Sequence, residues 1–256
     1  MGNLHSLIRD LHRRKARERR GLVVAEGRRL VVDALAGGAR VRAVLAAADV
    51  AEGPVAALLA DAAARGITTE VTSRKEFDAL ADTETPSGVL AVIEWAPLGL
   101  DAVRLDEGPA AVLVLDAVQD PGNVGTMVRT AFAIGATATV ALEGTADVRS
   151  PKVLRAAMGA LFRHPVAQAS AADCLEFLSR HRFELWAAAA DGAAIATDTR
   201  VPERIALVVG NEGGGIRPEL FSRAARRVAV PMREGAESLN AAVAVGILLH
   251  QVTRAR

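Results

Sequence analysis

The last fifty residues contain two apolar runs, and each run breaks into a loop that is rich in glycine and polar residues. The first run is Ile-Ala-Leu-Val-Val from Ile205, and Gly-Asn-Glu-Gly-Gly-Gly follows it from Gly210. The second run is Val-Ala-Val from Val228, and it leads into Pro-Met-Arg-Glu-Gly-Ala-Glu-Ser-Leu-Asn. In a parallel α/β sheet, ligands bind at the carboxyl ends of strands, where backbone N–H groups and helix N-termini converge. The two loops therefore predict one binding pocket.

Composition limits the classes of protein to which this chain belongs. Its 256 residues can form one large or two modest domains with a buried core. Hydrophobic residues make up 51% of the chain, yet no apolar run reaches the roughly eighteen residues that cross a membrane. The N-terminus lacks the apolar core of a signal peptide. We therefore expect a soluble, cytoplasmic protein with no membrane association.

Cysteine and histidine usage argues against disulfides and metal sites. Cys174 is the only cysteine, so no intrachain disulfide can form, and its helical, apolar context predicts a buried, inert thiol. The five histidines are scattered and show no metal-ligand spacing. We predict that the protein binds no metal.

Positive charge is concentrated near the N-terminus, although the net charge of the chain is only +1. Between residues 9 and 20, only Asp10 and Glu18 oppose a cluster of cations. The cations are Arg9, Arg13, Arg14, Lys15, Arg17, Arg19 and Arg20. Arginine binds phosphates in a bidentate way, and such binding releases counterions from nucleic acids. A solvated helix face explains this segment equally well on its own.

Strands and helices alternate along the chain, which is typical of α/β proteins. The predicted strands are 21–26, 41–47, 67–71, 88–94, 110–118, 136–142, 164–169, 183–190 and the two runs described above. The predicted helices are 27–35, 54–65, 73–81, 123–134, 151–161, 171–180, 218–225 and 238–253. The pattern lapses over residues 98–109, which contain Pro and Gly. We interpret that stretch as a linker between a domain of residues 1–97 and a domain of residues 110–256.

A polar loop follows the predicted strand at residues 110–118, whose first six residues are all apolar and suit the centre of a parallel sheet. The loop turns at a Pro-Gly pair and enters a helix at Asn123, so Asn123 by itself is best explained as an N-cap. Arg129 lies further along this helix among Val, Met, Ala, Phe and Ile residues. A cation on a mostly apolar helix needs a partner or a ligand. An ion pair with Asp116 or Asp120 is the alternative to a functional role.

Common nucleotide-binding motifs do not explain these loops. The chain has no G-x-x-x-x-G-K-[ST] sequence, which excludes a P-loop. The glycines that follow Gly210 lack the spacing G-x-G-x-x-G, and the acidic residue that binds ribose in a dinucleotide fold is missing. An oxidoreductase with such a fold is therefore a poor explanation.

Three stretches in a fixed order carry a family resemblance. They are Asn-x-Gly-x-x-x-Arg-Thr-Ala from Asn123, Val-Val-Gly-Asn-Glu-Gly around Gly210, and Val-Pro-Met from Val230 with the following Glu-Ser-Leu-Asn-Ala-Ala-Val-Ala. Together they closely resemble the motifs of the SpoU (TrmH-type) RNA ribose 2'-O-methyltransferases of the SPOUT superfamily. In the first domain, Val-Ala-Glu-Gly-Arg-Arg-Leu-Val and Asp-Thr-Glu-Thr-Pro-Ser-Gly-Val-Leu-Ala-Val are similar to the substrate-binding domain of ribosomal RNA members. The resemblance spans nearly the whole chain.

The resemblance implies a fold and a cofactor. A smaller α/β RNA substrate-binding domain would precede a parallel-sheet SPOUT domain, whose C-terminal segment forms a trefoil knot despite the general rarity of knots. S-adenosylmethionine would bind in the knot, and homodimers would complete the active site. The matching cofactor-binding positions are Gly210, Asn211, Gly213, Val230, Met232 and Leu239. Small and apolar residues suit this role, because the main chain can then approach an adenine ring.

The resemblance also implies a reaction, in which a ribose 2'-hydroxyl takes the sulfonium methyl group and S-adenosylhomocysteine is released. Arg129 matches the catalytic arginine, and because arginine is a poor proton acceptor we favour stabilisation of an alkoxide or phosphate. The other matching positions, Asn123, Glu212, Ser238 and Asn240, would orient the ribose and Arg129, with helix capping and turn formation as alternative roles. The residues that would hold RNA are Arg13, Arg14, Arg17 and Arg20.

Two related functions remain as alternatives. A non-catalytic RNA-binding member of the family would need no methyl transfer, but the intact Asn123, Arg129, Glu212 and Asn240 argue against it. A transfer RNA 2'-O-methyltransferase would commonly lack the added N-terminal α/β domain. The sequence therefore favours ribosomal RNA as the substrate.

Overall fold

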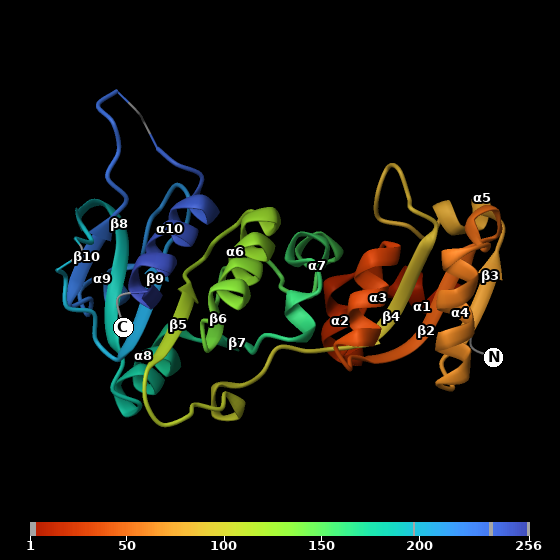
Figure 1. Ribbon diagram of the computed structural model, residues 1–256, viewed down its shortest axis with the longest axis horizontal. Helices are drawn as coiled ribbons and strands as arrows, with labels where there is room; N and C mark the ends of the chain where they lie inside the picture. The colour runs from red at the N-terminus through yellow and green to blue at the C-terminus, as the bar shows by residue number, and fades with distance from the viewer. Residues whose placement is uncertain (1–3, 197, 236–237, 255–256) are drawn as a thin grey trace. The chain divides into compact units, whose positions relative to one another are not determined.

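The protein consists of two compact units, each built around its own β-sheet. The computed structural model describes residues 4–196, 198–235 and 238–254 (Figure 1). The first unit is Met1–Ala96 with Arg149–Arg163, and the second is Pro97–Val148 with His164–Arg256. Residues 149–163 thus group with the first unit and interrupt the predicted domain of residues 110–256. The reason is local packing, since helix α7 (Pro151–Ala157) contacts strand β1 (Leu22–Glu26).

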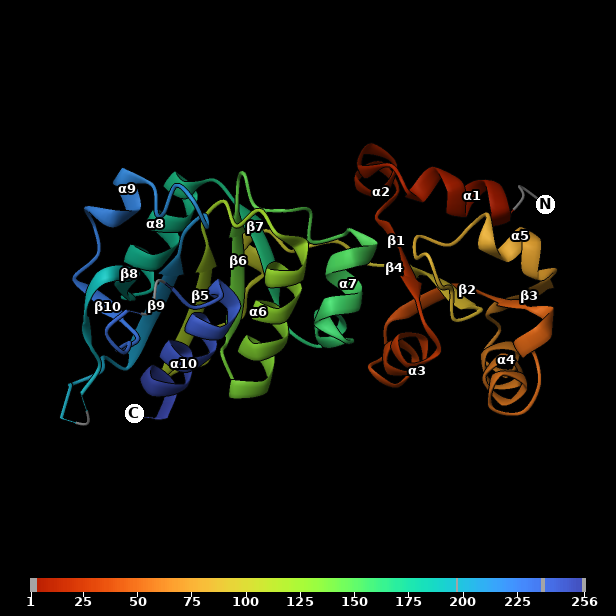
Figure 2. The same cartoon turned by 90° about the horizontal axis from the view of Figure 1, so that it is seen from above.

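The first unit has a four-stranded mixed sheet with helices on both faces (Figure 2). Besides β1, its strands are β2 (Arg40–Ala47), β3 (Thr68–Thr72) and β4 (Val89–Glu94), in the order β1-β4-β2-β3. Its remaining helices are α1 (Leu4–Leu11), α2 (Arg14–Arg20), α3 (Arg28–Ala36), η1 (Ala48–Val50), α4 (Pro54–Ala64), α5 (Arg74–Asp78) and η3 (Ala160–Phe162). Strand β4 runs antiparallel to both neighbours, whereas β2 and β3 are parallel. Side chains from α1 and α5, among them Ile8 and Phe77, join one core cluster on the sheet.

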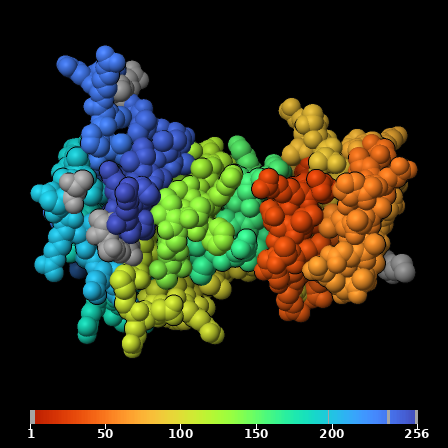
Figure 3. All heavy atoms as spheres, in the orientation of Figure 1, coloured from red at the N-terminus to blue at the C-terminus, as the bar shows by residue number. Residues whose placement is uncertain are grey.

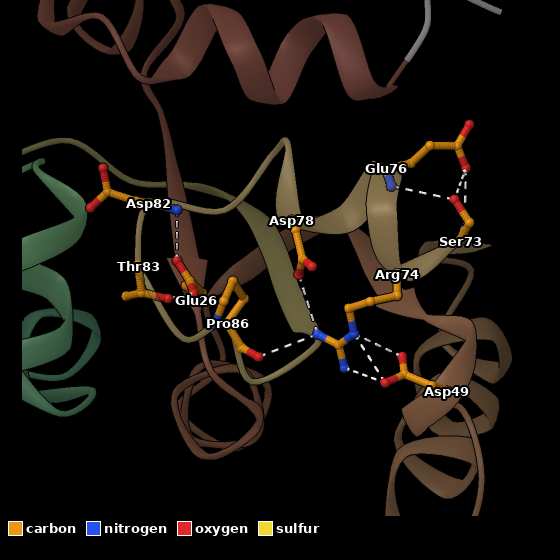
Figure 4. Close-up of polar contacts among 9 residues, drawn as sticks. All are labelled: Glu26, Asp49, Ser73, Arg74, Glu76, Asp78, Asp82, Thr83 and Pro86. Carbon is orange, nitrogen blue, oxygen red and sulfur yellow. Dashed lines mark hydrogen bonds and ion pairs between the residues drawn. The ribbon is translucent and has the colours of Figure 1, made fainter.

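The two sequence segments that resemble a substrate-binding domain meet in this unit. Glu26 ends β1, is buried, and accepts hydrogen bonds from the N–H of Asp82 at 3.0 Å and from the hydroxyl of Thr83 (Figure 4). Arg74 holds the other end of the same loop, because its guanidinium donates to Asp49 and to the carbonyl of Pro86 (Figure 4). The loop from residue 82 to residue 88 is therefore fixed at both ends.

The second unit has a six-stranded sheet in which every neighbouring pair is parallel. Its strands are β5 (Ala110–Leu115), β6 (Ala138–Leu142), β7 (Val166–Ala169), β8 (Glu184–Ala194), β9 (Arg204–Val209) and β10 (Arg226–Ala229), in the order β10-β8-β9-β5-β6-β7. Its helices are η2 (Leu100–Ala102), α6 (Pro121–Ile134), α8 (Ala171–Arg180), α9 (Pro218–Phe221) and α10 (Ala241–Arg254). Helices α6 and α10 cover one face and α8 and α9 the other (Figure 2). These observations confirm the predicted α/β class and parallel sheet.

Burial follows the predicted pattern in the centre of this sheet. Every residue of β5 is buried, as expected for a strand covered on both faces. Cys174 is also buried, and burial raises the pKa of its thiol to about 12. The predicted burial of Cys174 is confirmed, and a raised thiol pKa leaves little thiolate at neutral pH.

Several predicted helix boundaries were wrong for local reasons. The helix predicted at 151–161 breaks at Met158 and Gly159, whose φ angles are positive, at 47° and 79°. The helix predicted at 218–225 ends at Phe221, because the N–H of Ala225 already bonds to the carbonyl of Leu185 in β8. In the predicted linker, Leu98 forms a parallel bridge with Ala167. Among the described residues, no helix is long and apolar enough to cross a membrane.

Candidate active site

The glycine-rich loop after β9 folds tightly back on itself. A side-chain Cβ on Gly210 would lie 2.2 Å from the backbone carbon of Gly215, so only glycine fits there. The side chain of Asn211 shapes the rest of the loop. Its oxygen accepts from the N–H groups of Gly213 and Gly214 at 2.9 and 2.7 Å, and its amide donates to the carbonyl of Ala117 at 3.0 Å. The structure thus gives Asn211 an internal role in shaping this loop.

A buried ion pair anchors the far end of the same loop. Asp116 follows β5 and is 1% exposed. Its two oxygens accept from the backbone N–H and the Nε of Arg217, at 2.7 and 2.6 Å. Arg217 also donates to the carbonyl of Glu143 at 2.9 Å. Three loops at the carboxyl edge of the sheet are therefore joined by one carboxylate and one guanidinium.

The three predicted polar positions Asn123, Glu212 and Asn240 form a single hydrogen-bonded chain. The amide of Asn123 donates to Glu212 at 3.1 Å, and the amide of Asn240 donates to the oxygen of Asn123 at 2.9 Å. Glu212 also accepts from the backbone N–H groups of Gln119 and Asp120, at 3.1 and 3.4 Å. Asn123 is 89 positions from Glu212 and 117 positions from Asn240, so these bonds hold together segments that are distant in sequence.

Helix capping explains how the side chain of Asn123 becomes available. The prediction that Asn123 is the N-cap of its helix was wrong, because Asp120 has that position and accepts from the N–H of Asn123 at 2.7 Å. A corresponding difference occurs at the last helix, which was predicted to begin at Ser238. It begins at Ala241, and Asn240 accepts from the N–H of Ala242 at 2.9 Å.

Glu212 is a charged acceptor in this arrangement. Partial burial raises its pKa, but hydrogen bonds from Asn123 and from backbone N–H groups outweigh burial, and the pKa lies below its ordinary value. The carboxylate therefore stays ionised at neutral pH and keeps accepting from its donors. Because those bonds favour the charged form, Glu212 serves better as an anchor than as a proton shuttle.

Arg129 lies on the exposed side of α6. Within the described part of the chain, its guanidinium has no ion pair or hydrogen bond. The alternative of a pair with Asp116 or Asp120 is not realised, since Asp116 holds Arg217 and Asp120 caps α6. With respect to the described residues, the donors of this exposed arginine are therefore available for a ligand.

An apolar pocket of about 190 Å³ opens beside β8, β9 and β10. It is lined by Ala188, Ala189, Ala190, Val209, Val228, Ala229, Val230, Met232, Ser238, Leu239, Ala241, Ala244, Val245 and Leu248. Four predicted site residues meet there, namely Val230, Met232, Ser238 and Leu239. The predicted Gly210, Asn211 and Gly213 are not among the described lining residues, although Gly210 directly follows Val209.

Sequence reasoning missed several residues of this site. The alanines toward the end of β8, Ala188 to Ala190, form part of the pocket wall. Their position at the carboxyl end of an apolar strand was the available signal. Arg217 was missed because nothing in the sequence links it to Asp116 across about one hundred residues.

The predicted RNA-binding arginines differ in their surroundings within the first unit. Arg13, Arg14 and Arg20 are exposed, and each contacts a carboxylate of Asp10 or Glu18. Arg17 is only 5% exposed and donates to the carbonyls of Leu11 and His12, at 2.9 and 2.7 Å. The structure thus gives Arg17 a role in holding the turn between α1 and α2.

No cluster of three or more potential metal-binding side chains occurs among the described residues. The pocket itself suits an organic group, because its wall consists of small and apolar side chains with backbone close behind them. The site therefore combines an apolar recess, a fixed polar chain and an arginine that has no partner among the described residues.

Comparison with known proteins agrees with this geometry. The chain matches the SpoU rRNA Methylase family over residues 110–250 and an MRM3-like substrate binding domain over residues 7–91. A Bacillus subtilis protein named 23S rRNA (guanosine(2553)-2'-O)-methyltransferase RlmP is 34% identical over 244 residues, which cover 95% of this chain and 93% of that protein.

Solved structures show the same fold over the whole chain. The AdoMet-bound rRNA methyltransferase from Sinorhizobium meliloti has a TM-score of 0.84 and 29% identity, with 99% of this chain and 95% of that chain covered. The SpoU methyltransferase AviRb from Streptomyces viridochromogenes, in complex with AdoMet, has a TM-score of 0.85 and 26% identity, with coverage of 99% and 98%. The resemblance inferred from the three motifs is confirmed. Since the family match covers more than half of the sequence and includes the glycine-rich loop, the polar chain and the apolar pocket, the protein belongs to the SpoU rRNA methylase family.

Proposed function

We propose that this protein transfers the methyl group of S-adenosylmethionine to a ribose 2'-hydroxyl of ribosomal RNA. The observation that carries the proposal is the hydrogen-bonded chain of Asn123, Glu212 and Asn240, which joins the three motif loops at the carboxyl edge of one sheet. Arg129 on the same helix as Asn123 supplies a cation that no described carboxylate neutralises. Action on ribosomal RNA implies that the protein works in the cytoplasm.

The apolar pocket fits part of the cofactor. Its volume of about 190 Å³ is below that of pockets for whole drug-sized ligands, but a flat adenine ring is much smaller. Val230 and Leu239 would flank the ring, and backbone groups next to Gly210 would bond its polar edge. The bound cofactor supplies an electrophilic methyl group.

The residues of this chain would position and polarise the nucleophile. The ribose oxygen would take the methyl group as the C–S bond breaks and S-adenosylhomocysteine leaves, and the hydroxyl proton would pass to solvent. Where loss of the proton precedes formation of the C–O bond, negative charge would develop on the ribose oxygen. Arg129 would stabilise that charge, and the fixed amides of Asn123 and Asn240 would hold the ribose without reorganising. Ser238 lies in the pocket wall and could bond a polar group of the cofactor.

The proposed active site also favours a homodimer. Helices α6 and α10 lie side by side at the surface of the second unit (Figure 3). On α10, Val243 and Ile247 are 51% and 37% exposed and lie one turn apart. A second copy that covered this apolar stripe would also exclude water around Arg129 on the neighbouring helix. Replacing both residues by Glu should give monomers in sedimentation velocity; dimers that persist would contradict this interface.

We further infer a trefoil knot in the second unit. Strand β9 lies between β5 and β8, and α10 contacts β9, β10 and α6. Strand β10 lies at the edge of the sheet, and the chain after it returns as α10 to the region around β9. When the chain is pulled from its two ends, a knot would leave the final extension shorter than that of a fully straight chain. A full extension would contradict the inference.

The first experiment is methyl transfer from labelled S-adenosylmethionine to separated large-subunit, small-subunit and transfer RNAs. Wild type should yield a 2'-O-methylnucleoside in large-subunit RNA, as shown by nucleoside mass analysis. Arg129→Ala should lower the rate by about 100-fold or more, the scale of losing one electrostatic donor. Its stability should not change, since the guanidinium has no described partner.

The outcomes separate the related functions. Transfer to transfer RNA alone would replace the proposed substrate class. Tight cofactor binding without transfer to naked RNA would direct the assay to ribosomal particles. If the protein bound no S-adenosylmethionine, the methyltransferase proposal would fail and a non-catalytic RNA-binding role would take its place.

A further inference from the structure

The first two helices place four arginines around one cleft. The cleft has a volume of about 650 Å³, and its lining includes Arg9, Arg13, Arg19 and Arg20 together with Asp10. We call these four arginines and Asp10 the arginine cleft. All of these residues belong to the first unit. Sequence analysis singled out the charge of this segment but did not show that these side chains converge.

Asp10 joins three of these arginines. One of its oxygens contacts the guanidinium of Arg13, and the other accepts from Arg20 at 2.9 Å and from Arg19 at 3.4 Å. The Asp10 side chain is 12% exposed, so it lies at the base of the cleft. The hydrogen bonds from Arg13 and Arg20 lower the pKa of Asp10, which therefore stays charged at neutral pH.

The arginines keep donors for a ligand. The side chains of Arg13 and Arg19 are 73% and 69% exposed, although both contact Asp10. Each guanidinium carries five N–H donors, and Asp10 takes only one or two of them. Arg9 is also exposed and forms no ion pair with a carboxylate among the described residues. Four guanidinium groups against one carboxylate leave the cleft strongly positive.

The neighbouring arginines are organised differently. Arg14 bonds to Glu18 at 2.8 Å, and Arg17 is buried against main-chain carbonyls. Neither residue lines the cleft. The clustering is therefore selective, since the four cleft arginines converge from both sides of the α1–α2 turn while Arg14 and Arg17 contact different partners.

We propose that the arginine cleft binds backbone phosphates of the RNA substrate and that Asp10 is a positioning residue, which holds the guanidinium groups in place. The proposal rests on the proposed function for its ligand, because an RNA substrate provides the phosphodiester groups. Bidentate binding of a phosphate needs guanidinium groups in a fixed orientation. A carboxylate at the base of the cleft provides that orientation while the outer donors face the ligand.

The first test is binding of a large-subunit ribosomal RNA transcript at several salt concentrations. Replacing both Arg9 and Arg19 by Gln should weaken binding by about tenfold. The slope of log affinity against log salt should fall by about 1.5, which corresponds to two lost phosphate contacts. The matched control replaces Arg42 and Arg65 by Gln, which removes the same charge from exposed pairs with Glu94 and Asp61. The control should bind like wild type.

Asp10→Ala distinguishes an organised site from simple attraction by net charge. The variant is more positive than wild type, so attraction by net charge alone predicts tighter RNA binding. If Asp10 holds the arginines in place, binding should weaken by about threefold to tenfold despite the added positive charge. Tighter binding would therefore overturn the positioning role. Unfolding curves for all variants check that the helices remain folded.

Cofactor binding and catalysis separate this proposal from the proposed function. The Arg9 and Arg19 variant should keep its affinity for S-adenosylmethionine and its kcat, with a raised KM for RNA. If the Arg9 and Arg19 variant matches wild type in RNA affinity and in salt slope, and methyl transfer persists, only the cleft proposal fails. If wild type shows neither binding of S-adenosylmethionine nor methyl transfer, the proposed function fails. A third outcome would assign the cleft to a free anion and overturn the proposal. In that outcome, millimolar inorganic phosphate inhibits methyl transfer by wild type, and the Arg9 and Arg19 variant loses no RNA affinity.

Discussion

Polar side chains are organised in opposite ways in the two units. In the second unit, Asn123, Glu212 and Asn240 bond to one another and to main-chain N–H groups, with one main partner for each donor. In the first unit, several exposed arginines share the single carboxylate of Asp10. The first arrangement joins the polar groups to one another, whereas the second orients several cations on one carboxylate and leaves most of their donors for a ligand.

The difference corresponds to two physical tasks. Stabilising charge in a transition state requires groups that are already oriented, because the free energy needed to reorient them would offset the stabilisation. Holding a polyanion draws mainly on charge density, and one shared carboxylate is enough to orient several guanidinium groups toward the ligand. We therefore expect substitutions in the second unit to affect folding and cofactor binding, and exposed substitutions in the first unit to have smaller effects on stability.

The largest effect is expected for Gly210→Ala. Its new Cβ would lie within 2.3 Å of three backbone atoms of Gly215 and Ile216, which cannot move away as a side chain could. We expect the free energy of unfolding to fall by more than about 3 kcal/mol, together with loss of cofactor binding. Urea denaturation and calorimetric titration with S-adenosylmethionine measure the two effects. Gly213→Ala is the control for the stability effect alone, because its Cβ would meet only the Asn211 side-chain oxygen at 3.6 Å.

The next effect comes from the buried ion pair. Asp116→Asn removes the charge that holds Arg217 and should lower the free energy of unfolding by about 3 kcal/mol. Arg227→Gln breaks an exposed ion pair with Asp191 in the same unit. It should change the free energy of unfolding by less than about 1 kcal/mol. Equal effects in chemical denaturation would show that burial does not distinguish the two pairs.

A pH dependence should come from His164, which is 5% exposed and bonds Thr139 at 2.9 Å. Burial lowers its pKa from 6.5 to about 4, so the unfolded chain binds a proton more readily than the folded protein. Stability should therefore fall as pH drops below 6.5, by about 2 kcal/mol between pH 7 and pH 5. His164→Gln should flatten this dependence in urea titrations, while His250→Gln, at an exposed position of α10, should not.

The smallest effect is expected at an exposed cap in the first unit. Ser73 accepts from the N–H of Glu76 at the start of α5, and Glu76 bonds back to Ser73 (Figure 4). Ser73→Ala should lower the free energy of unfolding by about 1 kcal/mol. Ser73→Thr keeps an accepting hydroxyl and should retain most of the stability. A loss above about 3 kcal/mol would contradict the contrast between the two units.

Much of the fold could be predicted from local patterns. The fully apolar run at β5 indicated a strand covered on both faces, and alternating strands and helices indicated an α/β protein. Helix ends were less predictable. Both Asp120 and Asn123 can cap a helix, and only the folded loop shows that Asp120 does so.

The candidate site was predictable where its residues lie within recognisable motifs. Asn123, Glu212 and Asn240 were identified in this way, and the structure brings them together. The roles of the individual catalytic and cofactor-binding residues remain predictions. Arg17 shows the limit of charge patterns, since it lies within a basic run and yet is buried against carbonyls.

The sequence by itself determined the class of fold, the family and the segments that form the site, because apolar periodicity and motif order are local properties. Tertiary structure alone decided that Asp116 pairs with Arg217, that Arg129 keeps no described partner, and that residues 149–163 join the first unit. It also decided that Arg9 and Arg19 share a cleft with Asp10. These outcomes depend on distances between segments that are separate along the chain, and packing of the elements sets those distances.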